Sequence, residues 1–117
     1  MCKVSMDEHL RLSAQRALLG RITRGLRAVS VEKSNNVVKW RCVFGSEVAK
    51  ESQWELLSEA AAELIADFEP PTKIEEEYIV VRFRDSEQKV PNEIPHLKHI
   101  VFLRHERESY PELAINT

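Results

Sequence analysis

The stretch from Ser52 to Phe68 constrains the fold of this chain most, because it combines a helix start, an apolar stripe and a firm stop. Ser52 followed by Glu55 forms a capping box, in which the hydroxyl accepts from an early helix amide and the carboxylate reaches back to the cap. Pro70 and Pro71 prevent the helix from continuing. At about 100° per residue, the stripe occupies a sector of about 80° and predicts packing into a core. Its members are Trp54, Leu57, Ala61, Leu64 and Phe68.

An acidic row lies on the opposite side of the same predicted helix. It consists of Glu55, Glu59, Glu63 and Asp67, with Glu51 preceding them in the same four-residue series. Like charges at this spacing oppose the helix by roughly 0.2–0.5 kcal/mol per pair, and no Lys or Arg lies three or four residues away within the predicted helix. Leu56 lies at the edge of this face, where an exposed leucine would be available to a partner. The row is typical either of a solvated helix surface or of a binding face, and the pattern leaves both interpretations open.

The formal net charge of −2 conceals a strong segregation of charge along the chain. Residues 1–45 carry nine Lys or Arg against three acids, whereas residues 46–78 carry ten acids against Lys50 and Lys73. The acids include the run Glu75, Glu76 and Glu77, which opens the strand predicted after the helix. The two segments can neutralise each other if they fold together. If they do not, the molecule has an acidic end that would steer a cationic partner.

The rest of the chain predicts one more helix and four strands. The helix, with Ser5 and Glu8 as a capping box, should end before Gly20, which tolerates a left-handed conformation. Two strands joined by Ser34, Asn35 and Asn36 are typical of a tight hairpin, and a loop with two prolines precedes the last strand. The predicted elements are a helix over Met6–Leu19, strands over Leu26–Lys33, Val37–Gly45, Ile74–Arg84 and His99–Arg104, and a loop over Asp85–Lys98.

These elements predict a single α/β (α+β) domain spanning residues 1–117, in the order α-β-β-α-β-β. We expect a mainly antiparallel four-stranded sheet packed against the two helices, with residues 1–4 and about 107–117 loosely held. The link through the second helix permits either a parallel crossover or an antiparallel neighbour, so strand order stays open. With no apolar run of membrane-spanning length and no signal-peptide pattern, we expect a cytoplasmic protein, whose oligomeric state the sequence leaves open.

No pattern in the sequence predicts an enzyme, a metal site or a cofactor. There is no nucleophile elbow, phosphate-binding loop or dinucleotide fingerprint. His96, His99 and His105 lack the rigid, converging frame that zinc needs, and Cys42 lies in an apolar strand pattern typical of a core residue. We therefore expect no catalytic residue, no metal and no cofactor.

An alternative function is a small nucleic-acid-binding module that uses the basic first third of the chain. Its phosphate contacts would be Arg16, Arg21, Arg24 and Arg27. No aromatic residues interleave with these arginines, which disfavours a nucleic-acid surface.

Several phrases of the chain resemble a family of small bacterial immunity proteins. These phrases are Ala17-Leu-Leu-Gly20, Leu26-Arg-Ala-Val-Ser-Val31, Glu59-Ala-Ala-Ala-Glu-Leu-Ile-Ala-Asp-Phe68, Ile74-Glu-Glu-Glu77 and Leu103-Arg-His-Glu106. The family is that of immunity proteins of contact-dependent growth inhibition and related polymorphic toxin systems. The resemblance implies a cytoplasmic protein that binds and blocks the C-terminal toxin domain of a surface-displayed effector. Such toxins are often nucleases with cationic surfaces, which suits an acidic inhibitor, although the basic first third departs from that pattern.

The sequence therefore predicts a protein that binds a cognate toxin domain, with no direct nucleic-acid or membrane contact. The acidic side of the second helix and the neighbouring acidic strand entry are the predicted contact surface, with Leu56 as the apolar anchor. The partner-binding residues would be Glu51, Glu55, Leu56, Glu59, Glu63, Asp67, Glu75, Glu76 and Glu77.

Overall fold

The computed structural model describes residues 6–82 and 92–105, which form two helices and four strands. The predicted order α-β-β-α-β-β is confirmed. The elements are α1 (Met6–Leu18), β1 (Leu26–Ser34), β2 (Val37–Phe44), α2 (Glu47–Ala66), β3 (Lys73–Val80) and β4 (His99–Leu103). None of the described helices is long and apolar enough to cross a membrane.

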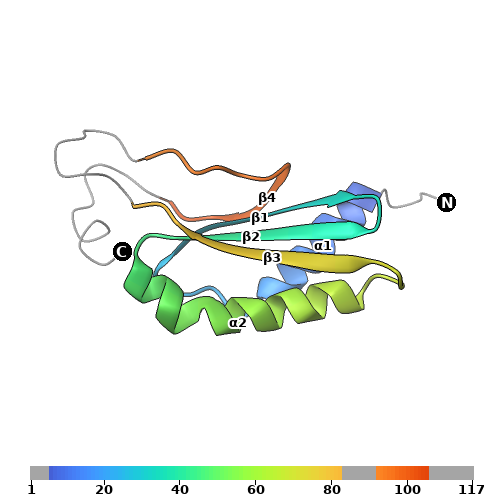
Figure 1. Cartoon of the computed structure of the whole chain (residues 1–117), viewed down its shortest axis with the longest axis horizontal. Helices are drawn as coiled ribbons and strands as arrows, with labels where there is room; N and C mark the ends of the chain where they lie inside the picture. Colours follow the sequence, from blue (N-terminus) through green and yellow to red (C-terminus); the bar gives the residue numbers. More distant parts are fainter. Residues whose placement is uncertain (1–5, 83–91, 106–117) are drawn as a thin grey trace.

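The strands form one mixed sheet in the order β3-β2-β1-β4. β1 pairs antiparallel with both β2 and β4, and β3 pairs parallel with β2. Of the two arrangements that the sequence permitted, the chain therefore uses a parallel crossover through α2. Figure 1 shows β3 and β4 at opposite edges of the sheet, with α2 running alongside β3 and α1 behind the strands.

The core lies between the two helices and one face of the sheet. Val38, Trp40, Cys42 and Phe44 alternate along β2 and are completely buried, as their period of two predicts. Leu57 and Leu64 of α2 and Leu10 of α1 meet them from the helical layer. Burial raises the pKa of the Cys42 thiol, so this cysteine is a core residue, as predicted.

Residues 92–98 cross the other face of the sheet. The amide of Leu97 donates to Ser30 Oγ at 2.9 Å, and Arg41 Nη1 donates to the carbonyl of Pro95 at 2.7 Å. Arg27 anchors the same region, because its guanidinium donates to the carbonyls of Val81, Arg82 and Asn92 at 2.8–3.2 Å. This segment is not a strand, but its backbone forms hydrogen bonds with polar side chains of β1 and β2.

Two turn residues adopt the positive φ angles that the sequence predicts. Gly20 follows α1 with a φ of +79°, and Asn35 has a φ of 56° in the turn that joins β1 to β2. The Ser5 cap predicted for α1 lies outside the described residues.

Two predicted boundaries are wrong by four residues or more, and the other differences are one or two residues. α2 begins at Glu47 rather than after Ser52, because Ser46 already caps it by accepting from the amide of Ala49 at 3.1 Å. No glycine or proline separates the two serines, so the helix runs through Ser52, whose hydroxyl donates to the Ala49 carbonyl. β3 ends at Val80 rather than Arg84, since Val80 pairs with Phe44, the last residue of β2.

Candidate partner-binding site

The acidic row of α2 winds around the helix instead of following one face. Each step of four residues advances about 40°, so the row turns by about 160° between Glu51 and Asp67. Its first members lie toward β3 and solvent, and its last members lie beside α1. The row therefore meets two different environments.

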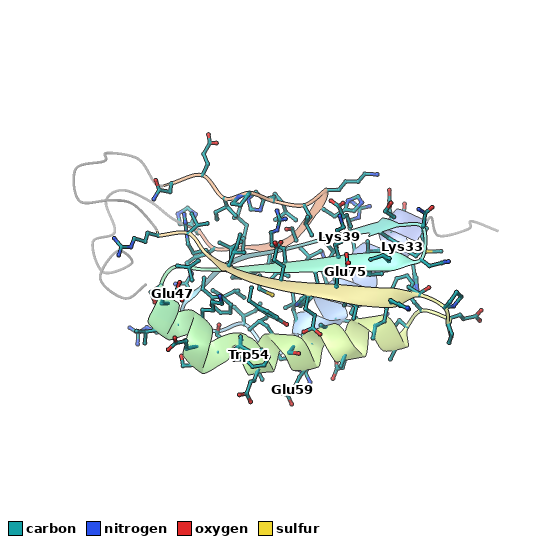
Figure 2. All side chains as sticks on the ribbon, in the orientation of Figure 1. Lys33, Lys39, Glu47, Trp54, Glu59 and Glu75 are labelled. Atoms are coloured by element: carbon teal, nitrogen blue, oxygen red, sulfur yellow. The ribbon has the colours of Figure 1, made fainter. Side chains whose placement is uncertain are left out.

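An open hollow of about 540 Å³ lies over the middle of α2. Its lining residues are Trp54, Glu55, Ser58, Glu59 and Ala62. Within the described part of the chain, the carboxylates of Glu51, Glu55 and Glu59 form no hydrogen bond or ion pair with another residue. Figure 2 shows Glu59 on the side of α2 away from the sheet and Trp54 on the side of the helix that faces the viewer. Two of these unpaired acids, Glu55 and Glu59, line the hollow together with Trp54, the aromatic residue of α2.

The prediction that Trp54 belongs to the core is wrong, because 40% of this residue is exposed. Trp54 lies at one margin of the apolar sector. Leu57 and Ala61 inside the sector and Leu64 at its opposite margin are buried as predicted, with Phe68 partly buried. From that margin the indole packs edge-on against Tyr78 of β3, with ring centroids 5.9 Å apart. Its position at the margin that adjoins Glu51 and Glu55 was the available signal that this tryptophan could be a surface residue.

Glu76 lies beside this hollow on the helix side of β3. Its Oε1 accepts from Ser58 Oγ at 2.6 Å and from the Tyr78 hydroxyl at 2.5 Å. Burial, together with the hydrogen bond to Glu76, raises the pKa of Tyr78, which therefore stays protonated as a donor. We call Trp54, Tyr78, Glu51, Glu55, Ser58 and Glu59 the Trp54 surface.

Glu75 and Glu77 point to the opposite side of β3 and are separated from the Trp54 surface. Glu77 forms an ion pair with Arg41 of β2. Glu75 lines a hollow that Lys39 also lines. Figure 2 shows the side chains of Glu75 and Lys39 above β3. Basic residues of β2 thus accompany these two acids.

The last acids of the row lie near α1. Glu63 forms an ion pair with Arg21 at 2.8 Å, and Asp67 caps the C-terminus of α2. Leu56 is partly buried and packs against the core, so it is not the exposed anchor that the sequence suggested. The predicted single acidic face is therefore three groups, of which the Trp54 surface alone combines unpaired acids with an accessible aromatic ring.

The four arginines of the nucleic-acid alternative are also divided. Arg27 is only 1% exposed and Arg21 is engaged by Glu63, whereas Arg16 and Arg24 are exposed. A buried guanidinium bound to carbonyls cannot contact phosphate. The arrangement therefore disfavours a nucleic-acid surface at these residues.

No group of three metal-ligating side chains occurs in residues 6–82 and 92–105. His99 lies 3.4 Å from a carboxylate oxygen of Asp7. Burial, with a smaller effect of Arg27, lowers the pKa of His96. His96 and His99 therefore contact other parts of the fold and do not converge with further ligands on a metal site in the described residues.

Comparison with known proteins finds a family model that matches the sequence of the chain. A family model described as MafI2 immunity protein matches residues 7–106, which include every described element except the first residue of α1. Among curated proteins, no sequence matches the chain.

Proposed function

Since the chain belongs to the MafI2 immunity protein family, we propose that it neutralises its toxin by placing the Trp54 surface against a cationic region of that toxin. The observation that carries the proposal is the exposed indole of Trp54 beside acids that have no partner in the described chain. Unpaired acids cost the helix stability, and a cationic partner would offset that cost.

The two kinds of side chain in the Trp54 surface have different roles in this proposal. Glu51, Glu55 and Glu59 steer the toxin and set the association rate, because exposed charges act mainly on diffusional encounter. Trp54 is the anchor that slows dissociation, since large aromatic side chains dominate binding free energy at interfaces. An Arg or Lys of the toxin could lie over the indole face while the flanking carboxylates bind its charge.

We further propose that the toxin is the C-terminal domain of an effector of contact-dependent inhibition or a related system, and that it is a nuclease. The sequence resemblance supports the first statement. The acidic character of the Trp54 surface supports the second, because a nuclease has a cationic surface for phosphates. The cytoplasmic location, the absence of catalysis and the roles of the nine predicted binding residues stay predictions.

The test is charge reversal at the Trp54 surface, with binding measured to the toxin encoded immediately upstream. We expect the double variant Glu55→Lys/Glu59→Lys to associate at least about tenfold more slowly and to lose much of the salt dependence of binding. Trp54→Ala should instead raise the dissociation rate by about 30-fold, as hot-spot residues do.

The matched control is Glu69→Lys/Glu93→Lys, which makes the same change of charge at two exposed acids away from the hollow. It should bind the toxin with nearly unchanged affinity. If the control loses as much affinity as the Glu55/Glu59 variant, only net charge matters and the proposed surface is wrong. Unchanged binding by both the Glu55/Glu59 and the Trp54 variants would place the interface elsewhere.

A further inference from the structure

A second surface, away from the acidic one, has a different character. Of the eight exposed large apolar side chains in the described residues, six belong to α1, the connector after it, and β4. Apolar side chains gathered in this way indicate an interaction surface, whereas scattered ones do not. The six are Met6, Leu12, Leu19, Ile22, Ile100 and Leu103.

The groove between α1 and β4 brings four of these side chains together. One hollow of about 370 Å³ is lined by Leu12 and Ile100, and a second of about 240 Å³ is lined by Leu19 and Ile22. Gln15 lines both hollows, so they are neighbours along α1. We call Leu12, Leu19, Ile22 and Ile100 the α1–β4 surface.

Among the residues that the structure describes, the strand beside this groove has an open edge. β4 is the last strand in the order β3-β2-β1-β4, and no described strand pairs with its outer side. Its sequence, from His99 to Leu103, contains no proline, lysine or acid that would discourage a further strand. Lys98 and Arg104 flank it, but Lys98 pairs with Asp7. Arg104 donates to two carbonyls of the connector before β1 and to the carbonyl of Leu26 at the start of β1.

We propose that a second copy of this chain binds here, pairing the two β4 strands antiparallel about a twofold axis and packing the two α1–β4 surfaces together. The resulting sheet would have the strand order β3-β2-β1-β4-β4-β1-β2-β3. Such an interface is self-complementary, because each contact between two different residues occurs twice.

Charge favours a second copy over the cationic toxin as the occupant. The two hollows are lined by one acid, Glu8, one base, Arg11, and otherwise uncharged residues, so this surface does not attract a cationic toxin by charge. The Trp54 surface lies beside β3, at the opposite edge of the sheet. Two copies joined at β4 would therefore keep their acidic surfaces far apart and free to bind toxin.

The experiment measures the mass of the full chain by light scattering and sedimentation over a range of concentrations. We expect the wild type to reach twice the chain mass of 13.5 kDa. Ile100→Lys and Leu12→Lys should each weaken self-association by at least about tenfold, because each places a charge in the apolar contact. Both side chains are about half exposed, so folding, checked by circular dichroism, should persist.

Val48→Lys is the matched control, since Val48 is an apolar side chain on α2 that is 76% exposed. It should dimerise like the wild type. A wild type that stays at 13.5 kDa at every concentration overturns the proposal, as does a dimer that tolerates both Ile100→Lys and Leu12→Lys or that Val48→Lys disrupts equally. A monomeric wild type whose toxin binding is weakened by Ile100→Lys would show that the toxin is the occupant, which also overturns the proposal.

Discussion

Replacing Arg27 by methionine should destabilise the protein by about 3 kcal/mol, because this buried guanidinium joins the sheet to two segments far along the chain. Arg27 is 1% exposed on β1. Its Nη1 donates to the carbonyls of Val81 at 2.8 Å and Arg82 at 3.0 Å, and its Nη2 donates to that of Asn92 at 3.2 Å. Methionine keeps most of the apolar stem but has no donor.

The magnitude follows from which acceptors would be left unpaired. The Arg82 carbonyl also accepts from Asn92 Nδ2 at 3.1 Å, so it keeps a partner. The carbonyls of Val81 and Asn92 lose the Arg27 donor, and a buried acceptor without a partner costs about 1–3 kcal/mol. Both residues are half-buried, so water can partly replace the guanidinium, and the expected loss of about 3 kcal/mol lies in the lower half of the combined range of about 2–6 kcal/mol.

Urea unfolding followed by circular dichroism would measure the loss as a change of midpoint at constant slope. Arg24→Met is the control, because Arg24 is exposed on the preceding connector and should change stability by no more than about 0.5 kcal/mol. Arg27→Lys should also be destabilising, since an ammonium cannot reproduce the fork of the guanidinium. A loss below about 1 kcal/mol for Arg27→Met, or full stability of Arg27→Lys, would refute the reasoning.

Two further predictions concern packing and pH. Gly25→Ala should cost about 1–3 kcal/mol in urea unfolding, because the new Cβ would lie 2.3 Å from the Cβ of Ala49. Gly20→Ala, where nothing lies within 4 Å but φ is +79°, should cost only about 1 kcal/mol, and a larger loss for Gly20→Ala than for Gly25→Ala would contradict the packing argument. Burial lowers the pKa of His96 below 6.5, so the unfolded chain binds a proton that the folded protein does not, and stability should fall as the pH drops below that value. The melting temperature should therefore decline more steeply between about pH 7 and pH 5 in the wild type than in His96→Gln, and parallel profiles would contradict this role.

Local patterns predicted most of the fold because they report on single elements. The alternation of Val38, Trp40, Cys42 and Phe44 identified β2 and its buried face, and Gly20 marked the end of α1. The start of α2 was misplaced because Ser46 and Ser52 are both acceptable caps, and local chemistry does not choose between them.

Contacts between distant segments could not be predicted in this way. Nothing near Arg27 in sequence indicates that its partners are the carbonyls of residues 81, 82 and 92. Because of these contacts, Arg27 is a buried residue that holds the fold together, whereas the sequence offered it as a phosphate ligand. The exposure of Trp54 likewise depends on Tyr78 of β3. Its place at the margin of the apolar sector was visible, but the neighbour that meets it there was not.

The division of the acidic row explains why the same charges support two interpretations in different parts of the molecule. A four-residue repeat drifts by about 40° per step on a helix, so no single surface can hold five such acids. Toward α1 the drift brings Glu63 to Arg21, and across the sheet Glu77 meets Arg41, so internal neutralisation is real at these places. Glu55 and Glu59, between these regions, have no basic neighbour in the described chain and flank an exposed indole instead. Because a solvated helix surface requires no accessible tryptophan, the coincidence of Trp54 with the unpaired acids favours a binding face.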